Sequence, residues 1–108
     1  MSQFLGEFEQ LVLLAILRLG AGAYGVTVMG EIERRTGRRV AMGAVYTTLA
    51  RLEAKGYVAF RLGDSLPERG GRRRKLYRLE PAGAAALDRS FEMLAGMMEG
   101  LPRKGEAW

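Results

Sequence analysis

The sequence contains no cysteine and no histidine among its 108 residues. Without cysteine, the chain can form no disulfide, no thiolate nucleophile and no cysteine-based zinc site. Without histidine, it lacks the usual general base and the commonest metal ligand. The carboxylates Glu31, Glu33 and Glu53 are interpreted as helix-surface charges with neither a base nor a metal partner. We therefore expect no enzymatic activity, no cofactor and no metal.

Long hydrophobic runs are also missing. The most apolar stretch, residues 11–19, is far shorter than the roughly 20 residues that span a bilayer. The first residues, Met1, Ser2 and Gln3, lack the basic region of a signal peptide. These observations predict a cytoplasmic, prokaryotic protein without a membrane partner. The length and the 48% hydrophobic content suit one small domain.

Positive charge is concentrated in one part of the chain. There are 17 Lys and Arg against 12 Asp and Glu, which gives a formal net charge of +5. Residues 61–78 hold seven basic and two acidic side chains, so this segment carries the whole excess and the remainder is balanced. Such a local footprint favours an anionic partner, either nucleic acid or an acidic membrane surface. A solvated basic loop is the alternative.

Hydrophobic residues spaced at the period of a helix predict three helices in the first half of the chain. Their expected ranges are residues 8–19, 24–36 and 42–55, and Gly37 and Gly56 stand where glycine ends a helix. The first helix is apolar on all sides. It is therefore either a central core helix or a helix shared between the core and a dimer partner.

The second half of the chain predicts a β-hairpin and one more helix. Residues 57–62 and 73–79 have strand-like composition and are separated by a segment rich in glycine and arginine. Pro81 suits the first turn of a helix whose apolar side chains recur every three or four residues and need a partner surface. We expect a homodimer formed by the first and fourth helices. The predicted interface residues are Leu13, Leu17, Leu87, Phe91, Leu94, Met98 and Leu101.

Three helices followed by a hairpin is the order of a winged helix-turn-helix, whose third helix enters the major groove of DNA. The predicted fold is therefore mainly α with a small β-hairpin: a winged helix-turn-helix over residues 1–80, a dimerisation helix over 81–101 and a disordered tail over 102–108. Short, hydroxylated or basic side chains suit base and phosphate contacts on the third helix. The candidates there are Gly43, Ala44, Tyr46, Thr47, Thr48 and Arg51.

The hairpin tip is the second predicted DNA contact. Its cationic side chains would neutralise phosphates, and its glycines would allow close approach of the backbone. The predicted wing residues are Arg69, Gly70, Gly71, Arg72, Arg73, Arg74 and Lys75.

Several short motifs, taken together in their order, resemble the PadR family of bacterial transcriptional regulators. They are LGEFEQL at 5–11, AYG at 23–25, GAVYTTL at 43–49, PERGGR at 67–72 and PAG at 81–83. The resemblance implies a homodimer that represses nearby genes. In some members it also implies release from DNA by a small apolar or aromatic effector, such as a phenolic acid or a drug. It further implies that Tyr46 and its neighbours contact DNA and that the hairpin arginines form the wing.

The chain departs from this family pattern at two helix starts and in its length. Ala41-Met42 and Glu80 stand where the family commonly has hydroxyl caps, and only one helix of about twenty residues follows the hairpin. Two other functions stay open. The hairpin could serve a winged-helix protein-interaction module. Alternatively, Phe91, Met93, Met97 and Met98 could line a pocket that captures an apolar ligand or drug.

Overall fold

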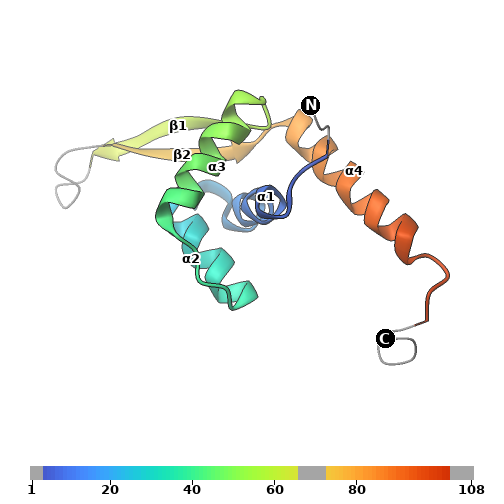
Figure 1. Ribbon diagram of the computed structural model, residues 1–108. Coiled ribbons are helices and arrows are strands. Elements are labelled where there is room, and N and C mark those ends of the chain that lie inside the picture. The colour runs from blue at the N-terminus through green and yellow to red at the C-terminus, as the bar shows by residue number, and fades with distance from the viewer. Residues whose placement is uncertain (1–3, 66–72, 103–108) are drawn as a thin grey trace.

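The computed structural model describes residues 4–65 and 73–102. Its elements follow in the order α1 (Glu7–Leu19), the 3₁₀ turn η1 (Gly20–Gly22), α2 (Gly25–Thr36), α3 (Met42–Ala54), β1 (Val58–Ser65), β2 (Arg73–Leu79) and α4 (Pro81–Met98) (Figure 1). This order confirms the predicted fold, a winged helix-turn-helix followed by one further helix. The tail expected after Leu101 lies, apart from Pro102, outside the described residues.

The helix and strand ends follow local sequence signals. Gly37 and Gly56 adopt φ of 73° and 77°, the left-handed conformation that ends α2 and α3. Pro81 begins α4, as predicted. Strand β1 continues three residues beyond its predicted end, to Ser65, with a register shift against β2 after Leu62.

Helix α1 lies at the centre of the molecule, in contact with α2, α3, β2 and α4 (Figure 1). Its residues Val12, Leu13 and Ile16 pack in one core with side chains from the other helices and the hairpin. Cover from several elements of the same chain explains the apolar character of α1 on most sides, while Leu17 stays exposed. Leu13 is 0% exposed and Leu87 of α4 only 3%, so neither can contribute to a dimer interface as the sequence suggested.

The hairpin is attached to the helical part of the fold at its base. Phe60 and Tyr77 are paired across the two strands, and their ring centroids are 5.9 Å apart. The Tyr77 N–H donates a hydrogen bond of 2.8 Å to the carbonyl of Ala23, just before α2. The two strands extend away from the helices (Figure 1). The strands therefore place the wing in a defined position relative to α2.

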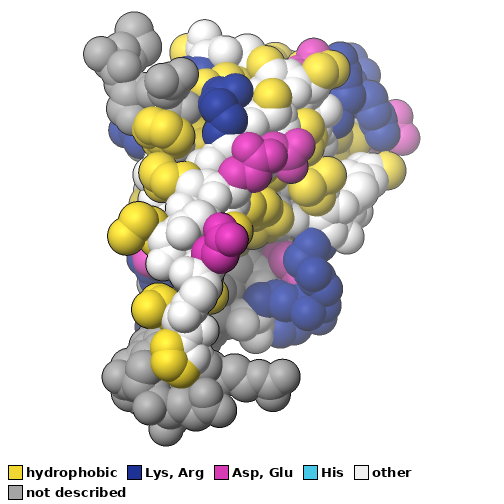
Figure 2. Space-filling model, turned by 90° about the vertical axis from the view of Figure 1, so that its right-hand side faces the viewer, with side chains coloured by type: hydrophobic (Ala, Val, Ile, Leu, Met, Phe, Trp, Pro, Cys, Tyr) yellow, Lys and Arg dark blue, Asp and Glu magenta, His cyan; other side chains and the backbone are white. Residues whose placement is uncertain are grey.

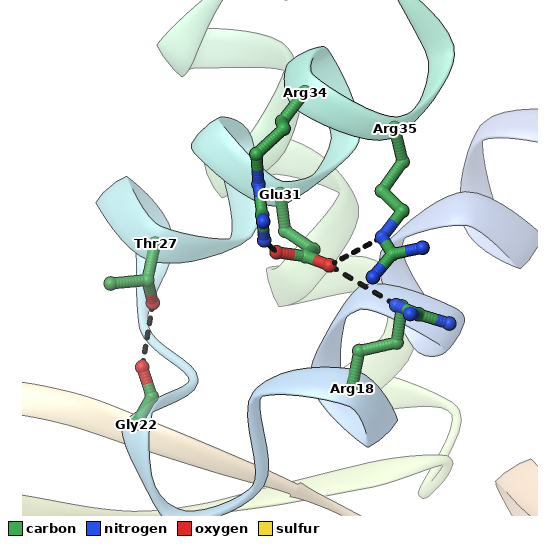
Figure 3. Close-up of polar contacts among 6 residues, drawn as sticks. All are labelled: Arg18, Gly22, Thr27, Glu31, Arg34 and Arg35. Atoms are coloured by element: carbon green, nitrogen blue, oxygen red, sulfur yellow. Dashed lines mark hydrogen bonds and ion pairs between the residues drawn. The ribbon is translucent and has the colours of Figure 1, made fainter.

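Glu31 of α2 is not the solvent-facing charge that the sequence suggested, because only 5% of its side chain is exposed. Its Oε2 lies 3.1 Å from Arg18 Nε and 3.2 Å from Arg35 Nε, and its Oε1 pairs with Arg34 (Figure 3). Burial alone would raise the pKa of the Glu31 carboxyl. The hydrogen bonds and charges of the three arginines outweigh burial and lower this pKa below its usual 4.5. Glu31 therefore ties α2 to Arg18 of α1.

Helix α4 has a packed first half and an exposed second half. Gly83 lies against the Tyr57 carbonyl so closely that a Cβ there would be 2.3 Å from its oxygen. Ser90 is the last buried residue, and every residue from 91 to 102 is exposed. The second half of α4 extends away from the core (Figure 1). Among the described helices, none is long and apolar enough to cross a membrane.

Candidate nucleic-acid interface

Helix α3 buries one side and presents the other to solvent. Val45, Leu49 and Leu52 are 0% exposed and anchor it in the core. Of the residues predicted to meet DNA, those that lie on the exposed side are Gly43, Ala44, Tyr46, Thr47 and Arg51. Thr48 is different: it is buried at 5% exposure, because it lies on the same side of α3 as Val45 and Leu52. We therefore remove Thr48 from the predicted base contacts.

Tyr46 is held at the edge of the exposed face by the start of α2. Its ring is half exposed and packs directly over Gly25. A Cβ at Gly25 would lie 2.6 to 2.9 Å from three atoms of the Tyr46 side chain, which is closer than real Cβ contacts. Any larger residue at position 25 would therefore displace this ring. Sequence reasoning placed Gly25 in a motif and on the inward face of the second helix, but it did not predict the contact with Tyr46, since the close approach comes from the packing of α2 against α3.

The wing lies on the Tyr46 side of α3, and a groove of about 350 Å³ separates them. The Arg74 guanidinium lies 4.9 Å from the centre of the Tyr24 ring, and Lys75 Nζ lies 4.4 Å from that of Phe60. Both distances are in the range of cation–π contacts. Arg73 Nε donates a 2.7 Å hydrogen bond to the Gly63 carbonyl. The other predicted wing residues, Arg69, Gly70, Gly71 and Arg72, lie outside the described residues.

The groove between α3 and the wing is also lined by a tyrosine and a glutamate. Tyr77 faces it from β2 and Glu53 from α3. Burial, then the negative charge of Glu53 and the neighbouring Tyr46, raise the pKa of the Tyr77 hydroxyl. Tyr77 therefore stays neutral at physiological pH.

The turn before α3 contributes two arginines that sequence reasoning missed, on the side of α3 away from the wing. Arg38 and Arg39, from the turn between α2 and α3, line a hollow of about 530 Å³ together with Gly43, Thr47 and Arg51. The Arg-Arg pair is visible in the sequence. Outside residues 61–78, however, basic and acidic residues are equal in number, so no excess of charge marked this pair. Only the folded chain shows which carboxylates neutralise which arginines.

Glu9 of α1 illustrates this pairing. Its Oε2 lies 2.8 Å from Lys55 Nζ, and its Oε1 accepts a 2.9 Å hydrogen bond from the Gly6 N–H. Burial alone would raise the pKa of Glu9, but the hydrogen bonds from Lys55 and Gly6 and the charges of Lys55 and Arg51 lower it. Glu9 therefore neutralises Lys55 at the end of α3 and does not face the hollow.

Apolar side chains are exposed along the second half of α4. Figure 2 shows hydrophobic side chains along one edge of this helix. Among the predicted interface residues, those that are exposed are Leu17, Phe91, Leu94, Met98 and Leu101. Met93 and Met97 are exposed beside them, so the described residues do not enclose a pocket around these methionines within one chain.

The sequence profile of the "Transcriptional regulator PadR-like family" matches residues 13–89, which include the core of the fold, α3 and the wing. The chain belongs to the PadR-like family. It is therefore a DNA-binding transcriptional regulator and not an enzyme. No curated protein is significantly similar to the chain in sequence.

Solved structures of other regulators share the PadR-like fold. A transcriptional regulator from Clostridium thermocellum is 23% identical, with a TM-score of 0.68, and the match covers 82% of this chain and 81% of that one. A PadR-like regulator from Bacillus cereus is 22% identical, with a TM-score of 0.63 and coverages of 84% and 82%. BpsR of Bordetella bronchiseptica, whose DNA binding is regulated by 6-hydroxynicotinic acid, is 22% identical, with a TM-score of 0.63 and coverages of 94% and 71%.

Proposed function

We propose that this PadR-like protein represses transcription by binding a two-fold symmetric operator as a homodimer. The observation that carries the proposal is the exposed face of α3, which lies between the basic wing and the arginines of the α2–α3 turn. An anchored helix with cationic groups on both sides suits insertion into the major groove between two phosphate backbones.

The side chains of α3 differ in the contacts that they offer. Ala44 and the Thr47 methyl suit the methyl group of thymine, and the Tyr46 and Thr47 hydroxyls suit base edges. Arg51 lies further along the same face and suits phosphate or guanine. Wing residues Arg74 and Lys75 suit phosphates, which fix position without reading sequence. Gly43 allows close approach at the start of the helix.

The exposed apolar side chains support the homodimer. Leu94, Met98 and Leu101 are each about half exposed, and Leu17 of α1 is 52% exposed. Exposed apolar side chains of this kind are unfavourable in water, and a second copy related by two-fold symmetry would cover them on both subunits. The dimer would also pair two α3 helices for the two halves of an operator.

The experiment that tests this proposal is sequencing of genomic DNA fragments retained by the purified protein. We expect an inverted repeat with half-site centres about 34–36 Å apart, close to one helical turn. Transcription in vitro from a promoter that contains this repeat should fall when the protein is added. An asymmetric motif, no enriched motif or increased transcription would contradict the proposal.

A small apolar or aromatic effector is a further part of the proposal. A hollow of about 460 Å³ lies between α1 and α2, lined by Leu14, Leu17 and Ile32 with Arg18 and Arg35 among its polar residues. It suits a small aromatic acid, and it shares Leu17 with the proposed dimer interface. A bound molecule could therefore alter the spacing of the two α3 helices.

The effector is tested with benzoate and 6-hydroxynicotinate as probes, measured by melting temperature and by affinity for operator DNA. At least one probe should raise the melting temperature and weaken DNA binding. Replacement of Leu14 by Asn should reduce both effects. Unchanged melting temperature and unchanged DNA affinity with both probes would contradict an effector of this class in this hollow.

A further inference from the structure

We infer that the turn between α2 and α3 is a second phosphate-binding surface, which holds the DNA backbone on the side of α3 away from the wing. This inference rests on the proposed docking of α3 in the major groove. The surface consists of Arg38 and Arg39 from the turn and Arg51 from α3, around the hollow described above. Nothing in the charge distribution along the sequence indicated it.

The two sides of α3 face different surroundings. Gly43, Thr47 and Arg51 line the hollow at the turn, whereas Tyr46 and Glu53 line the groove at the wing. The major groove is about 12 Å wide, and an α-helix with its side chains has a diameter of about 10–12 Å. A helix that fills the groove therefore has one phosphate backbone on each side. The wing can serve only the backbone on its own side, and the other backbone would meet the turn.

The hollow is positively charged because its arginines are poorly neutralised. No carboxylate is among the described residues that line it. In the described part of the chain, ion pairs within 4.0 Å involve neither Arg39 nor Arg51. Arg38 has one partner, Glu7, whose Oε1 lies 2.6 Å from Arg38 Nη1. Glu7 is 76% exposed, so solvent weakens this pair and a phosphate can compete with it.

The two buried glutamates of this half of the chain are occupied elsewhere, whereas Glu33 accepts a 2.8 Å hydrogen bond from the Val40 N–H within the turn. Glu31 is surrounded by Arg18, Arg34 and Arg35, and Glu9 is bound to Lys55. Glu31 carries one negative charge against three arginines, so the α1–α2 contact has no negative charge to spare for the turn. Positive charge therefore stays at the turn, where the proposed DNA position requires it.

The test compares the wild-type protein with Arg38→Gln, Arg39→Gln and the double variant. Affinity is measured by fluorescence anisotropy between about 50 and 200 mM salt, on the duplex selected by retention and on an unrelated duplex. Each lost phosphate contact should lower the slope of log affinity against log salt by about 0.9, hence by about 1.8 per substitution in a dimer. Both duplexes should lose affinity by the same factor, and Arg39→Lys should retain most of it.

Arg34→Gln is the matched control. Arg34 is exposed and paired with a glutamate, as Arg38 is, but it lines neither the hollow at the turn nor the hollow between α1 and α2. This variant should keep the wild-type salt slope. Melting temperatures should confirm that all the variants fold.

Glu7→Gln tests the same surface by a gain of affinity. Releasing Arg38 from its partner should tighten binding to both duplexes and steepen the salt slope. Asp88→Asn on the exposed face of α4 makes the same change in net charge away from the turn and should have a smaller effect. Equal effects of Glu7→Gln and Asp88→Asn would contradict a local site.

The outcomes separate this inference from the proposed function. If the wild type binds DNA but the turn variants keep its affinity and salt slope, this inference is wrong and the proposed function stands. If the turn variants weaken only the selected duplex, the arginines read bases, which also overturns a phosphate surface. A wild type that binds neither duplex would overturn both.

Discussion

At the scale of single residues, Gly25 controls the position of a proposed base-reading side chain. It is buried at the start of α2, and the Tyr46 ring occupies the space that a side chain at position 25 would need. Tyr46 in turn lies at the edge of the exposed face of α3, beside the wing groove. The identity of residue 25 should therefore affect DNA recognition although Gly25 itself is buried.

We predict that Gly25→Ala displaces Tyr46 and weakens binding to the selected operator about tenfold, because a good base contact is worth about 1–3 kcal/mol. Binding to an unrelated duplex should stay close to the wild-type value. Tyr46→Ala should produce a similar loss, and the double variant should be no worse than either single variant. Fluorescence anisotropy with both duplexes measures these effects.

Gly30→Ala provides the control on the same helix. A Cβ at Gly30 would meet nothing within 4 Å. This variant should keep wild-type DNA binding and raise the free energy of unfolding by about 0.5–1 kcal/mol, because alanine is a better helix former than glycine. Equal operator affinities for wild type and Gly25→Ala would remove Gly25 from recognition.

At the scale of the elements, the attachment of α2 to α1 depends on the ionised Glu31 carboxylate. Its pKa is lowered in the folded protein, so the ion pairs stabilise the fold at pH values above the usual 4.5 of the unfolded chain. This stabilisation is lost as the pH falls through the lower pKa of the folded state. Acidification should therefore weaken the α1–α2 contact.

We predict that Glu31→Gln lowers the midpoint of urea unfolding at pH 7, and that the difference from wild type shrinks as the pH is lowered toward and below 4.5. Glu99→Gln, at the exposed end of α4, should keep the wild-type midpoint throughout. A difference between wild type and Glu31→Gln that is constant with pH would show that packing, and not the ion pairs, explains the loss.

At the scale of the whole molecule, the exposed half of α4 is the surface that we propose a second copy covers. We predict that Leu94→Asp converts the dimer to a monomer, because it places a charge within the apolar surface proposed to be covered by the partner. Light scattering at micromolar concentration measures this change. Glu92→Gln on the same helix should remain dimeric. A stable wild-type monomer at this concentration would contradict the proposed assembly.

The order of the elements was predictable because its signals are local. Helix spacing, the glycines at positions 37 and 56 and the proline that begins α4 are readable without knowledge of the partners of each element. The exposed residues of α3 followed from the same spacing. The wrong predictions concern residues whose burial depends on packing against parts of the chain that are distant in sequence. Leu13, Thr48 and Glu31 are each buried by a second element or by distant side chains that a periodic pattern does not specify.

The basic turn was missed for a related reason. Its arginines form a positive surface because Glu9 and Glu31 pair with other cations and because Glu7, the partner of Arg38, is exposed. Total charge along a segment records the number of ionic groups and not their partners. The wing was recognisable because its excess charge lies within one short segment.

The most direct test of the account is the salt dependence of DNA binding when the wing is neutralised. Arg74 and Lys75 are described at the hairpin, and we propose that both contact phosphates. In a dimer, Arg74→Gln with Lys75→Gln should lower the slope of log affinity against log salt by up to about 3.6, and selected and unrelated DNA should lose affinity nearly equally. Unchanged affinity and unchanged slope would show that the hairpin is a solvated loop and would favour a protein-interaction module.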